Sequence, residues 1–228
     1  MTKSNNEKDI LALETISELK NYNNYTFNLI KQKIQTGKVL DFGCGFGVFS
    51  EYLQKSGYSV DGFDVNNEAV LESKSRGVNT FSDISQINQR YETVTSSNVL
   101  EHVEDDIALL YDIKSLLKEN GTLVLYLPAS KIAWTQMDED VNHFRRYSKK
   151  ELIEKLTRSG FKVRSAKYID FIGWLVLIIF KLFRIKPKFN KKLLIFYDKF
   201  FFKNLKFLDY FFQKIVGKNL LVVADLKE

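Results

Sequence analysis

Three glycines at alternate positions, Gly43, Gly45 and Gly47, follow a short apolar run. Because glycine lacks a Cβ atom, such a turn can be tight and its backbone can approach a ligand closely. The spacing is G-x-G-x-G rather than the G-x-G-x-x-G of dinucleotide-binding turns, and the acidic Asp41 precedes it. A carboxylate here disfavours a pyrophosphate, so the segment predicts a binding site for a ligand that carries a positive charge.

Two further acids end later apolar runs. Asp64 follows Gly45 by 19 residues, a spacing at which a carboxylate can accept hydrogen bonds from both hydroxyls of a ribose. Asp83 ends the next run, where it could accept a hydrogen bond from an adenine amine. The two acids together indicate a nucleoside. The alternative for both is ordinary capping of turns and strand ends.

The chain has only two histidines, His102 and His143, and each is a candidate base near neutral pH. A supporting role beside the ligand is the alternative for His102. His143 lies in a polar and aromatic segment that precedes a helix capped by Ser148, and we expect this segment to bind substrate. Its candidate substrate-binding residues are Trp134, Arg145, Arg146 and Tyr147. The alternative is a solvated connection in which one of the arginines pairs with Asp138 or Asp140.

Apolar runs alternate with segments of helical periodicity, which indicates strands joined by helical crossovers. The expected strands are residues 38–42, 59–63, 79–81, 93–97, 121–127 and 161–168, and the expected helices are residues 48–55, 66–75, 105–117 and 149–159. This order predicts an α/β fold with a doubly wound, mostly parallel sheet. In such a sheet a ligand binds at the carboxyl ends of the strands.

The motifs, taken in this order, resemble those of class I S-adenosylmethionine-dependent methyltransferases. The resemblance rests on the stretch from Val39 to Gly47, on Asp64, on the pair Ser82-Asp83, and on the stretch from Ser97 to Val103. It covers residues 37–168 and a last strand near residues 220–226. It implies a Rossmann-like methyltransferase fold with a sheet of seven strands.

The resemblance also implies the cofactor, S-adenosylmethionine, and the residues that hold it. The glycine turn would face the methionine part, Asp41 the amino group and Asp64 the ribose. Asp83 with Ile84 would face the adenine, and Ser97 with Asn98 would lie beside the sulfonium. The full expected set is Asp41, Gly43, Cys44, Gly45, Gly47, Asp64, Val65, Asp83, Ile84, Ser97 and Asn98. We expect Cys44 to be a small packed residue rather than a nucleophile.

The sequence favours an oxygen, over a nitrogen or a carbon, of a small or membrane-associated acceptor, such as a lipid-linked sugar or a quinone-like molecule. Asn98 is followed by Val-Leu-Glu rather than by Pro-Pro and an aromatic residue, and no Pro-Cys dipeptide occurs. Both absences argue against methylation of nucleic-acid bases. In this interpretation His143 or His102 acts as base, Arg145 and Arg146 hold an anionic part of the acceptor, and Tyr147 with Trp134 shapes the pocket. The alternatives are an NAD-dependent oxidoreductase and a catalytically silent, cofactor-binding interaction module at the membrane surface.

A metal site is a further alternative at the histidines. One subgroup of these methyltransferases binds a divalent metal through a Glu-x-x-Glu-His arrangement and a distant histidine. Glu101, His102 and His143 match part of that set, but Asn98 stands where the first glutamate would be. Three mixed ligands are sparse evidence, so we expect no metal.

Residues 171–219 differ in composition from the rest of the chain. They contain eleven Lys and Arg residues against two acids, and 14 of the 32 aromatic residues. The apolar run at residues 171–180 is too short for the ~20 residues that span a bilayer, and residues 191–218 have amphipathic helical spacing. We therefore expect a helical, basic and aromatic insertion before the last strand. Binding to a membrane surface is favoured over a helical lid on the sheet or a second subunit, and nucleic-acid binding is the least favoured.

The remaining composition is that of a folded globular protein with 228 residues and a net charge of +6. We expect a helical N-terminal segment over residues 1–36, with Ile10, Leu13 and Ile16 at helical spacing, that covers the cofactor cleft. One cysteine and a polar start indicate a cytoplasmic protein, with peripheral attachment to the inner face of the cell membrane through residues 171–219. The sequence leaves the oligomeric state open.

Overall fold

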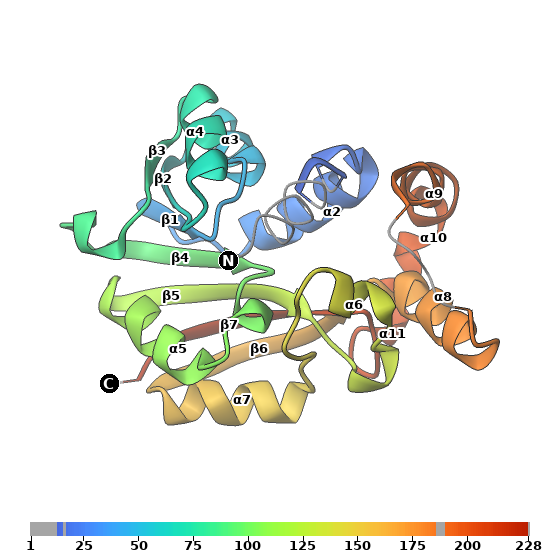
Figure 1. The fold of residues 1–228 in the computed structure, drawn as a ribbon. Helices are drawn as coiled ribbons and strands as arrows, with labels where there is room; N and C mark the ends of the chain where they lie inside the picture. Colours follow the sequence, from blue (N-terminus) through green and yellow to red (C-terminus); the bar gives the residue numbers. More distant parts are fainter. Residues whose placement is uncertain (1–12, 16, 186–189, 228) are drawn as a thin grey trace.

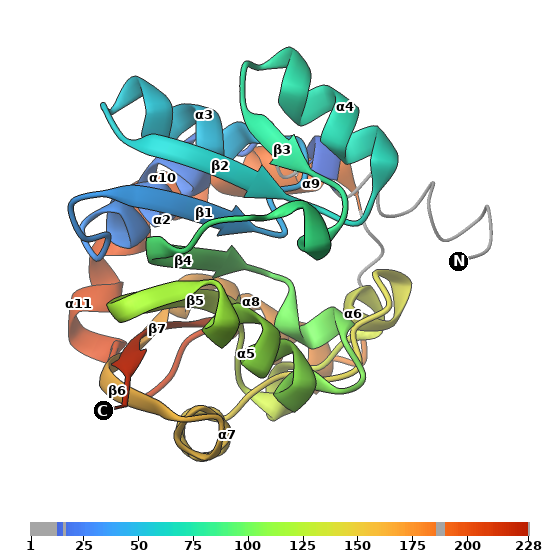
Figure 2. The ribbon, with the colours of Figure 1, turned by 90° about the vertical axis from the view of Figure 1, so that its left-hand side faces the viewer.

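A single sheet of seven strands forms the centre of the structure, a computed structural model that describes residues 13–15, 17–185 and 190–227. The strand order is β3-β2-β1-β4-β5-β7-β6, and Figure 2 shows the strands stacked in this order. The strands are β1 (Lys38–Phe42), β2 (Ser59–Phe63), β3 (Asn79–Phe81), β4 (Tyr91–Ser97), β5 (Leu117–Pro128), β6 (Phe161–Ile169) and β7 (Asn219–Leu226). Only β7 runs antiparallel to its neighbours β5 and β6. The predicted α/β fold, doubly wound and mostly parallel, is confirmed.

Helices cover both faces of the sheet (Figure 1). They are α2 (Lys20–Lys31), α3 (Val48–Lys55), α4 (Asn67–Ser75), α5 (Asp106–Ser115), α6 (Gln136–Asp140) and α7 (Lys149–Arg158), with short 3₁₀ turns η1 (Ile84–Gln86), η2 (Leu100–His102) and η3 (Lys131–Ala133). Consecutive residues of β1 point to opposite faces of the sheet, and both faces are covered by helices. Val39 packs with Ile30 and Leu53 of α2 and α3, whereas Leu40 packs with Leu110 of α5. This double burial explains why the strands are continuous apolar runs rather than alternating ones.

Local sequence explains most helix starts. Asn66 accepts hydrogen bonds from the amides of Glu68 and Ala69 at the start of α4, and Ser148 caps α7 by accepting from Glu151, as predicted. Most boundaries lie within two residues of the predicted ones, and the largest difference is at the start of β5. Helix α5 ends at Ser115 and β5 begins at Leu117, four residues before the predicted start, because Leu117 already pairs with Tyr91 of β4.

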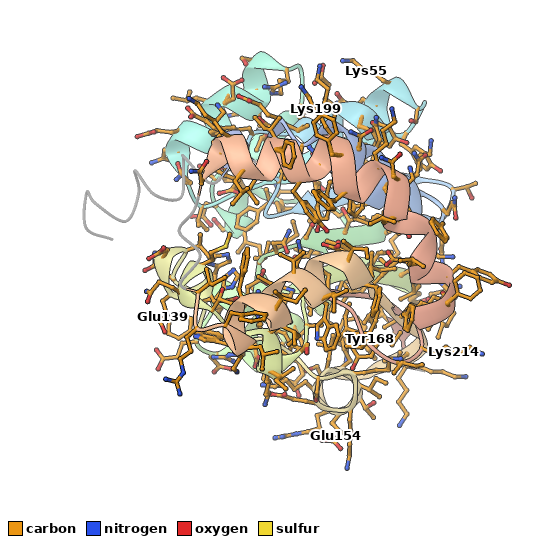
Figure 3. All side chains as sticks on the ribbon, turned by 90° about the vertical axis from the view of Figure 1, so that its right-hand side faces the viewer. Lys55, Glu139, Glu154, Tyr168, Lys199 and Lys214 are labelled. Atoms are coloured by element: carbon orange, nitrogen blue, oxygen red, sulfur yellow. The ribbon has the colours of Figure 1, made fainter. Side chains whose placement is uncertain are left out.

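The segment between β6 and β7 is helical, as expected, but it is broken into several short pieces. They are α8 (Phe171–Leu182), α9 (Lys191–Tyr197), a π-helical turn η4 (Asp198–Phe202), α10 (Lys203–Leu205), a 3₁₀ turn η5 (Lys206–Leu208) and α11 (Asp209–Phe212). These pieces lie beyond the carboxyl ends of β5 and β6 (Figure 1). Figure 3 shows them as a layer in front of the sheet. Within the described part of the chain, no helix has both the length and the apolar character that crossing a bilayer requires.

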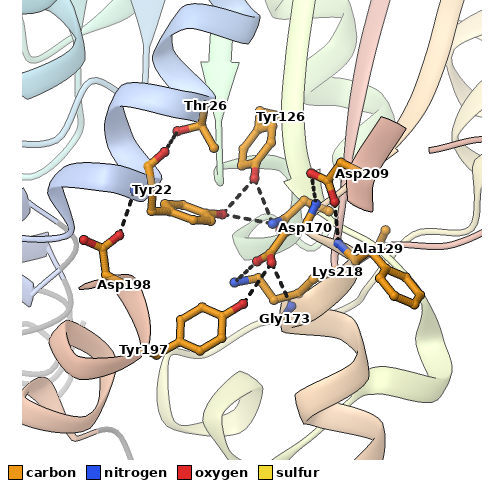
Figure 4. A network of polar contacts seen from close by, with 12 residues as sticks. Tyr22, Thr26, Tyr126, Ala129, Asp170, Gly173, Tyr197, Asp198, Asp209 and Lys218 are labelled. Carbon is orange, nitrogen blue, oxygen red and sulfur yellow. Dashed lines mark hydrogen bonds and ion pairs between the residues drawn. The ribbon is translucent and has the colours of Figure 1, made fainter. Parts of the chain in front are cut away.

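The two acids of this insertion fix it to the rest of the molecule (Figure 4). Asp198 accepts hydrogen bonds from the main-chain amides of Asn21 (3.1 Å) and Tyr22 (2.7 Å) in the first turn of α2. Asp209 accepts from the amides of Asp170 (2.8 Å) and Phe171 (2.7 Å) at the start of α8. Both acids are buried. Each therefore satisfies amides that a helix start leaves without intrahelical partners.

The ends of the insertion meet at the sheet. Lys218 Nζ lies 2.7 Å from Asp170 Oδ2, and the Lys218 amide donates to the carbonyl of Asp170. At the other end of the chain, the expected helical positions Ile10 and Ile16 lie outside the described residues. Residues 13–15 and 17–36 of the N-terminal segment are described, and they include α2, whose Ile30 is buried on the sheet.

Candidate functional site

The glycine turn between β1 and α3 has the backbone that only glycine adopts without strain. Its φ angles are +78° at Gly43, +51° at Gly45 and +72° at Gly47. A Cβ atom at Gly43 would lie 2.2 Å from Val99 Cγ2, and one at Gly47 would lie 2.4 Å from Ser73 Oγ. Val99 belongs to the segment after β4, so the glycine turn and that segment are in direct contact.

Asp64 joins this turn to the end of β2. Its Oδ2 accepts a hydrogen bond from the Gly45 amide (2.8 Å) and its Oδ1 accepts one from the Asn66 amide (2.9 Å). A carboxylate oxygen can accept more than one hydrogen bond, so the group keeps capacity for two hydroxyls. Burial raises the pKa of Asp64, although both amide bonds oppose this. The neighbouring Val65 is exposed.

Beneath the turn, Asp41 is buried in β1. It accepts hydrogen bonds from Ser50 Oγ (2.6 Å) and Thr95 Oγ1 (3.2 Å). Burial raises its pKa to about 6. These contacts join β1 to α3 and β4, and contact with a cofactor amino group stays a prediction. Cys44 is buried as well, and burial raises the pKa of its thiol, so it has the surroundings expected of a packed residue.

The remaining expected cofactor residues end β3 and β4. Asp83 is exposed and accepts a hydrogen bond from the Ser85 amide (2.8 Å), and this bond lowers its pKa. Asp83 thus caps η1, and adenine binding stays a prediction for it and for the half-buried Ile84. Asn98 has a φ of +54° and its amide side chain donates to Ser97 Oγ (3.4 Å). Because β3, β2, β1 and β4 are neighbours, all the expected cofactor residues lie along one edge of the sheet.

The N-terminal segment lies against this edge. A Cβ atom at Gly45 would come within 2.9 Å of Leu13 Cδ2, so the Leu13 side chain packs directly on the glycine turn. Thr15 is fully buried beside it along the chain.

The two histidines lie together after β4. Their ring centroids are 4.7 Å apart, although 41 positions separate His102 from His143. The Phe144 amide donates to the carbonyl of Glu101 (2.8 Å), which holds the segment of His143 against η2. Burial of the ring and the neighbouring His143 lower the pKa of His102 to about 4, and a hydrogen bond with the backbone of Val141 opposes this shift.

His143 is oriented by Asp138, an acid that the sequence predicted only as an ion-pair partner of Arg145 or Arg146. His143 Nδ1 lies 2.9 Å from Asp138 Oδ1, and Nε2 lies 3.8 Å from Glu101 Oε1. Burial opposes ionisation of Asp138, but the hydrogen bond with His143 and the charge of Arg146 bring its pKa below the usual value. With a proton on Nδ1, Nε2 carries a free lone pair and can accept a proton from a neighbouring hydroxyl.

Glu101 is a buried carboxyl group without a hydrogen-bond partner on either oxygen. Burial raises its pKa to about 8, so the group is mainly protonated at neutral pH. Ligand atoms of Glu101, His102 and His143 lie within 4.8 Å of one another, and these are residue types that a divalent transition metal accepts. Two ligands of one zinc ion are at most about 4.2 Å apart. A spacing of up to 4.8 Å is therefore looser than a formed metal centre.

Two of the expected substrate-binding residues are structural instead. Tyr147 is fully buried in the core, and its hydroxyl donates to Asp106 Oδ2 (2.8 Å). Arg146 is buried and its Nε lies 2.6 Å from Asp138 Oδ1. Their burial does not favour the predicted contact with an acceptor. The alternative interpretation, in which an arginine pairs with Asp138, describes Arg146 correctly.

The other two residues remain accessible. Arg145 pairs with Asp106 (2.9 Å) and donates to the carbonyl of Glu104, but its side chain is partly exposed. Trp134 is half-buried and its Nε1 lies 3.4 Å from Glu139 Oε1.

Sequence reasoning missed a polar cluster at the same edge (Figure 4). The hydroxyls of Tyr22 and Tyr126 lie 2.7 Å apart, and the Asn219 amide donates to both at 2.9 Å. Burial raises the pKa of both tyrosines. The available signal was a polar group next to apolar strand residues: Tyr126 lies two residues before the end of β5, and Asn219 is the first residue of β7.

Comparison with known proteins assigns this arrangement to a family. Residues 17–166 match the family model of a methyltransferase domain. A ubiquinone biosynthesis O-methyltransferase of Haemophilus ducreyi is 31% identical over 118 residues, which cover 43% of this chain and 50% of that protein. A mitochondrial ubiquinone biosynthesis O-methyltransferase of Schizosaccharomyces pombe is 33% identical over 39% of this chain and 36% of that protein. The chain thus matches half or less of the length of these relatives.

Solved structures share the fold. A putative methyltransferase of Haloferax volcanii, in complex with a methyltransferase activator, has a TM-score of 0.66 and 15% identity, with 96% of each chain covered. Magnesium protoporphyrin IX methyltransferase of Synechocystis, with S-adenosylmethionine bound, has a TM-score of 0.54 and 16% identity, covering 97% of this chain and 84% of that one. At these identities the likeness concerns the fold alone. Residues 171–219 lie outside the family match.

Proposed function

The chain belongs to the methyltransferase domain family and is a class I S-adenosylmethionine-dependent methyltransferase, and from this premise we propose that it methylates an oxygen of a small acceptor that is quinone-like or linked to a lipid. The proposed oxygen specificity is supported by the relatives that are named as O-methyltransferases of ubiquinone biosynthesis. The family assignment gives no support to the nicotinamide chemistry considered above.

We assign the cofactor to the edge formed by the ends of β3, β2, β1 and β4. In this assignment the two oxygens of Asp64 bind the ribose hydroxyls while the Gly45 and Asn66 amides hold the carboxylate in place. The cofactor supplies a methyl group that is already activated on its sulfonium. The protein therefore has to align an acceptor oxygen with that methyl group and remove the proton from the oxygen.

His143 is the proposed base, and its pairing with Asp138 at 2.9 Å is the observation that carries this proposal. Nδ1 donates to Asp138, which leaves Nε2 to take the proton of the acceptor hydroxyl. Glu101 adds no negative charge beside Nε2 while it is protonated. Trp134 and Arg145 are the proposed acceptor contacts, because they are the accessible members of the predicted set.

The test is the variant His143→Ala, assayed by transfer of labelled methyl groups from S-adenosylmethionine to hydroxylated quinones and to extracted polyprenyl lipids. Loss of a general base lowers turnover by about 10²–10⁴-fold. We expect turnover to fall in this range while the cofactor dissociation constant, measured by calorimetry, changes by less than about 3-fold, which is under 1 kcal/mol.

Gln136→Ala, an exposed change in the same segment, is the matched control and should retain wild-type turnover. An equal loss of turnover and cofactor affinity in His143→Ala would assign His143 a structural role. Unchanged turnover would refute its role as base.

A further inference from the structure

Exposed apolar side chains are concentrated on the insertion. Of the 18 large hydrophobic residues that are exposed in the described structure, 13 fall between Leu175 and Ile215. They are Leu175, Ile179, Leu182, Phe183, Ile185, Leu193, Phe196, Phe200, Phe201, Phe207, Tyr210, Phe211 and Ile215. We call the surface that they form the insertion face. Apolar exposure on this scale indicates an interaction surface rather than the scattered apolar residues of an ordinary monomer.

The insertion face is also cationic. Six basic side chains are exposed on it, namely Lys181, Arg184, Lys192, Lys199, Lys203 and Lys214, and Figure 3 shows Lys199 and Lys214 on this side. The only two acids of residues 171–219, Asp198 and Asp209, are buried and accept main-chain amide hydrogens. The acids are thus turned inward, and the outward surface carries apolar and positive groups together.

The insertion face adjoins the segment between β5 and α7, which carries His143 and the proposed acceptor contacts Trp134 and Arg145. Trp174 Nε1 in α8 donates to Ser130 Oγ (2.9 Å), and Lys181 Nζ donates to the carbonyl of Ile132 (3.0 Å). Ile132 is itself exposed, as is Phe144 beside His143. Exposed apolar side chains therefore occur both on α8 and in the segment that carries His143, and α8 contacts that segment through Ser130 and Ile132.

We propose that the insertion face docks onto the surface of an anionic lipid bilayer. Its aromatic and aliphatic side chains enter the interfacial layer, and its lysines contact lipid phosphates, as basic amphipathic helices do. Charge complementarity selects this occupant: a second copy would bring like charges together, and the aliphatic content exceeds what a nucleic acid would contact. Such docking would also bring a lipophilic acceptor to His143, and this second step rests on the proposed function.

The test is co-sedimentation of the full chain with vesicles of phosphatidylcholine containing about one third phosphatidylglycerol, compared with pure phosphatidylcholine. The variants are Phe207→Ser/Phe211→Ser, which removes apolar contacts, and Lys199→Glu/Lys203→Glu, which reverses charge. Leu71→Ser on α4 is the matched control, because Leu71 is exposed outside the insertion face. We expect the wild type and the control to bind anionic vesicles at least 10-fold more tightly than either double variant. Binding to pure phosphatidylcholine should be at least 10-fold weaker than to anionic vesicles.

Three results would overturn the proposal. They are wild-type protein that stays in solution with anionic vesicles, double variants that bind as tightly as the wild type, and a dimer that buries Phe207 and Phe211 and does not bind vesicles. An RNA mobility shift at the same salt without vesicle binding would assign the face to nucleic acid. Calorimetry with S-adenosylmethionine on the same samples keeps the tests separate, since a docking failure leaves cofactor binding intact and a failed methyl transfer leaves vesicle binding intact.

Discussion

Single residues at the candidate site differ in how far sequence could predict them. Spacing along the chain was enough to predict Asp64 and the glycine turn as cofactor contacts, because these residues lie close together in the sequence. The burial of Tyr147 and Arg146 could not be predicted, since nothing in a polar loop says which of its side chains turns toward the core. Asp138 illustrates the same limit: it lies five positions before His143 and contacts that ring because the chain turns after α6, where the His143 amide donates to the carbonyl of Asp138.

Asp41 gives a pH dependence that can be measured. Its pKa is raised from 3.8 to about 6, so the folded state binds the proton more tightly than the unfolded chain does. This contribution to the free energy of unfolding is therefore fully present below pH 3.8 and is lost as the pH rises through 6. Between pH 4 and 7 the wild type should lose up to about 3 kcal/mol relative to Asp41→Asn, measured by urea unfolding.

The pH dependence that Asp83 contributes to stability has the opposite sign. Its pKa is lowered, so its contribution is present above the unfolded value and is lost as the pH falls. Wild-type stability should therefore decline toward acid relative to Asp83→Asn. An Asp41→Asn variant that follows the wild-type pH profile would contradict the assignment of a raised pKa to Asp41.

A substitution at Glu101 distinguishes two roles for this residue, a neutral buried acid and a metal ligand. Because burial keeps the group mainly protonated at neutral pH, Glu101→Gln preserves its charge state and shape. We expect this variant to keep turnover within about 5-fold of wild type, a loss of about 1 kcal/mol. We also expect dialysis against a chelator to leave wild-type activity unchanged. Metal analysis by mass spectrometry is the independent readout, and one bound divalent ion per chain, lost in Glu101→Gln, would refute this account.

At the scale of elements, the strands and most helices could be predicted because their signals are local. A glycine or an acid directly follows the apolar runs of β1, β2 and β6, and capping residues such as Asn66 define helix starts. The arrangement of the insertion could not be predicted in this way. Asp198 binds the Tyr22 amide across 176 positions, and no periodicity within residues 171–219 encodes that contact. The broken helices of the insertion are positioned by such distant anchors.

Removing either of the two buried acids of the insertion, Asp198 or Asp209, should have a separate effect. Asp209→Ala removes the acceptor of the Asp170 and Phe171 amides, and Asp198→Ala removes that of the Asn21 and Tyr22 amides. Each change should lower the free energy of unfolding by about 1–3 kcal/mol, because buried amides lose their partner. Hydrogen exchange should quicken at the start of α8 in Asp209→Ala and at the start of α2 in Asp198→Ala. Each variant is the control for the other, and identical exchange maps would contradict separate anchoring.

On the scale of the whole molecule, parts far apart in the sequence meet near the edge to which we assign the cofactor. The segment of Leu13 lies on the glycine turn, and α2 is fixed to the insertion through Asp198. The sequence predicted that the N-terminal segment covers the cofactor, and the packing of Leu13 on Gly45 agrees with such coverage. It gave no sign that the same segment also contacts the insertion.

Coverage by Leu13 can be tested directly. Leu13→Ala removes apolar surface next to the glycine turn and should weaken S-adenosylmethionine binding by about 10-fold, which corresponds to the loss of one or two buried methylene groups. Calorimetry measures this change, and Leu71→Ala on the exposed side of α4 is the matched control. Unchanged or tighter binding in Leu13→Ala would show that the segment does not contribute to the bound state.

The ion pair between Asp170 and Lys218 has a consequence for how such proteins diversify. It closes residues 171–217 at their base, where β6 and β7 are already paired in the sheet. The entropy of closing a loop grows only slowly with its length, so the sheet tolerates appendages of very different size at this junction. A short hairpin or a foreign segment grafted between the two residues should leave the catalytic framework folded. Selection can thus exchange this appendage while the seven-stranded sheet stays the same.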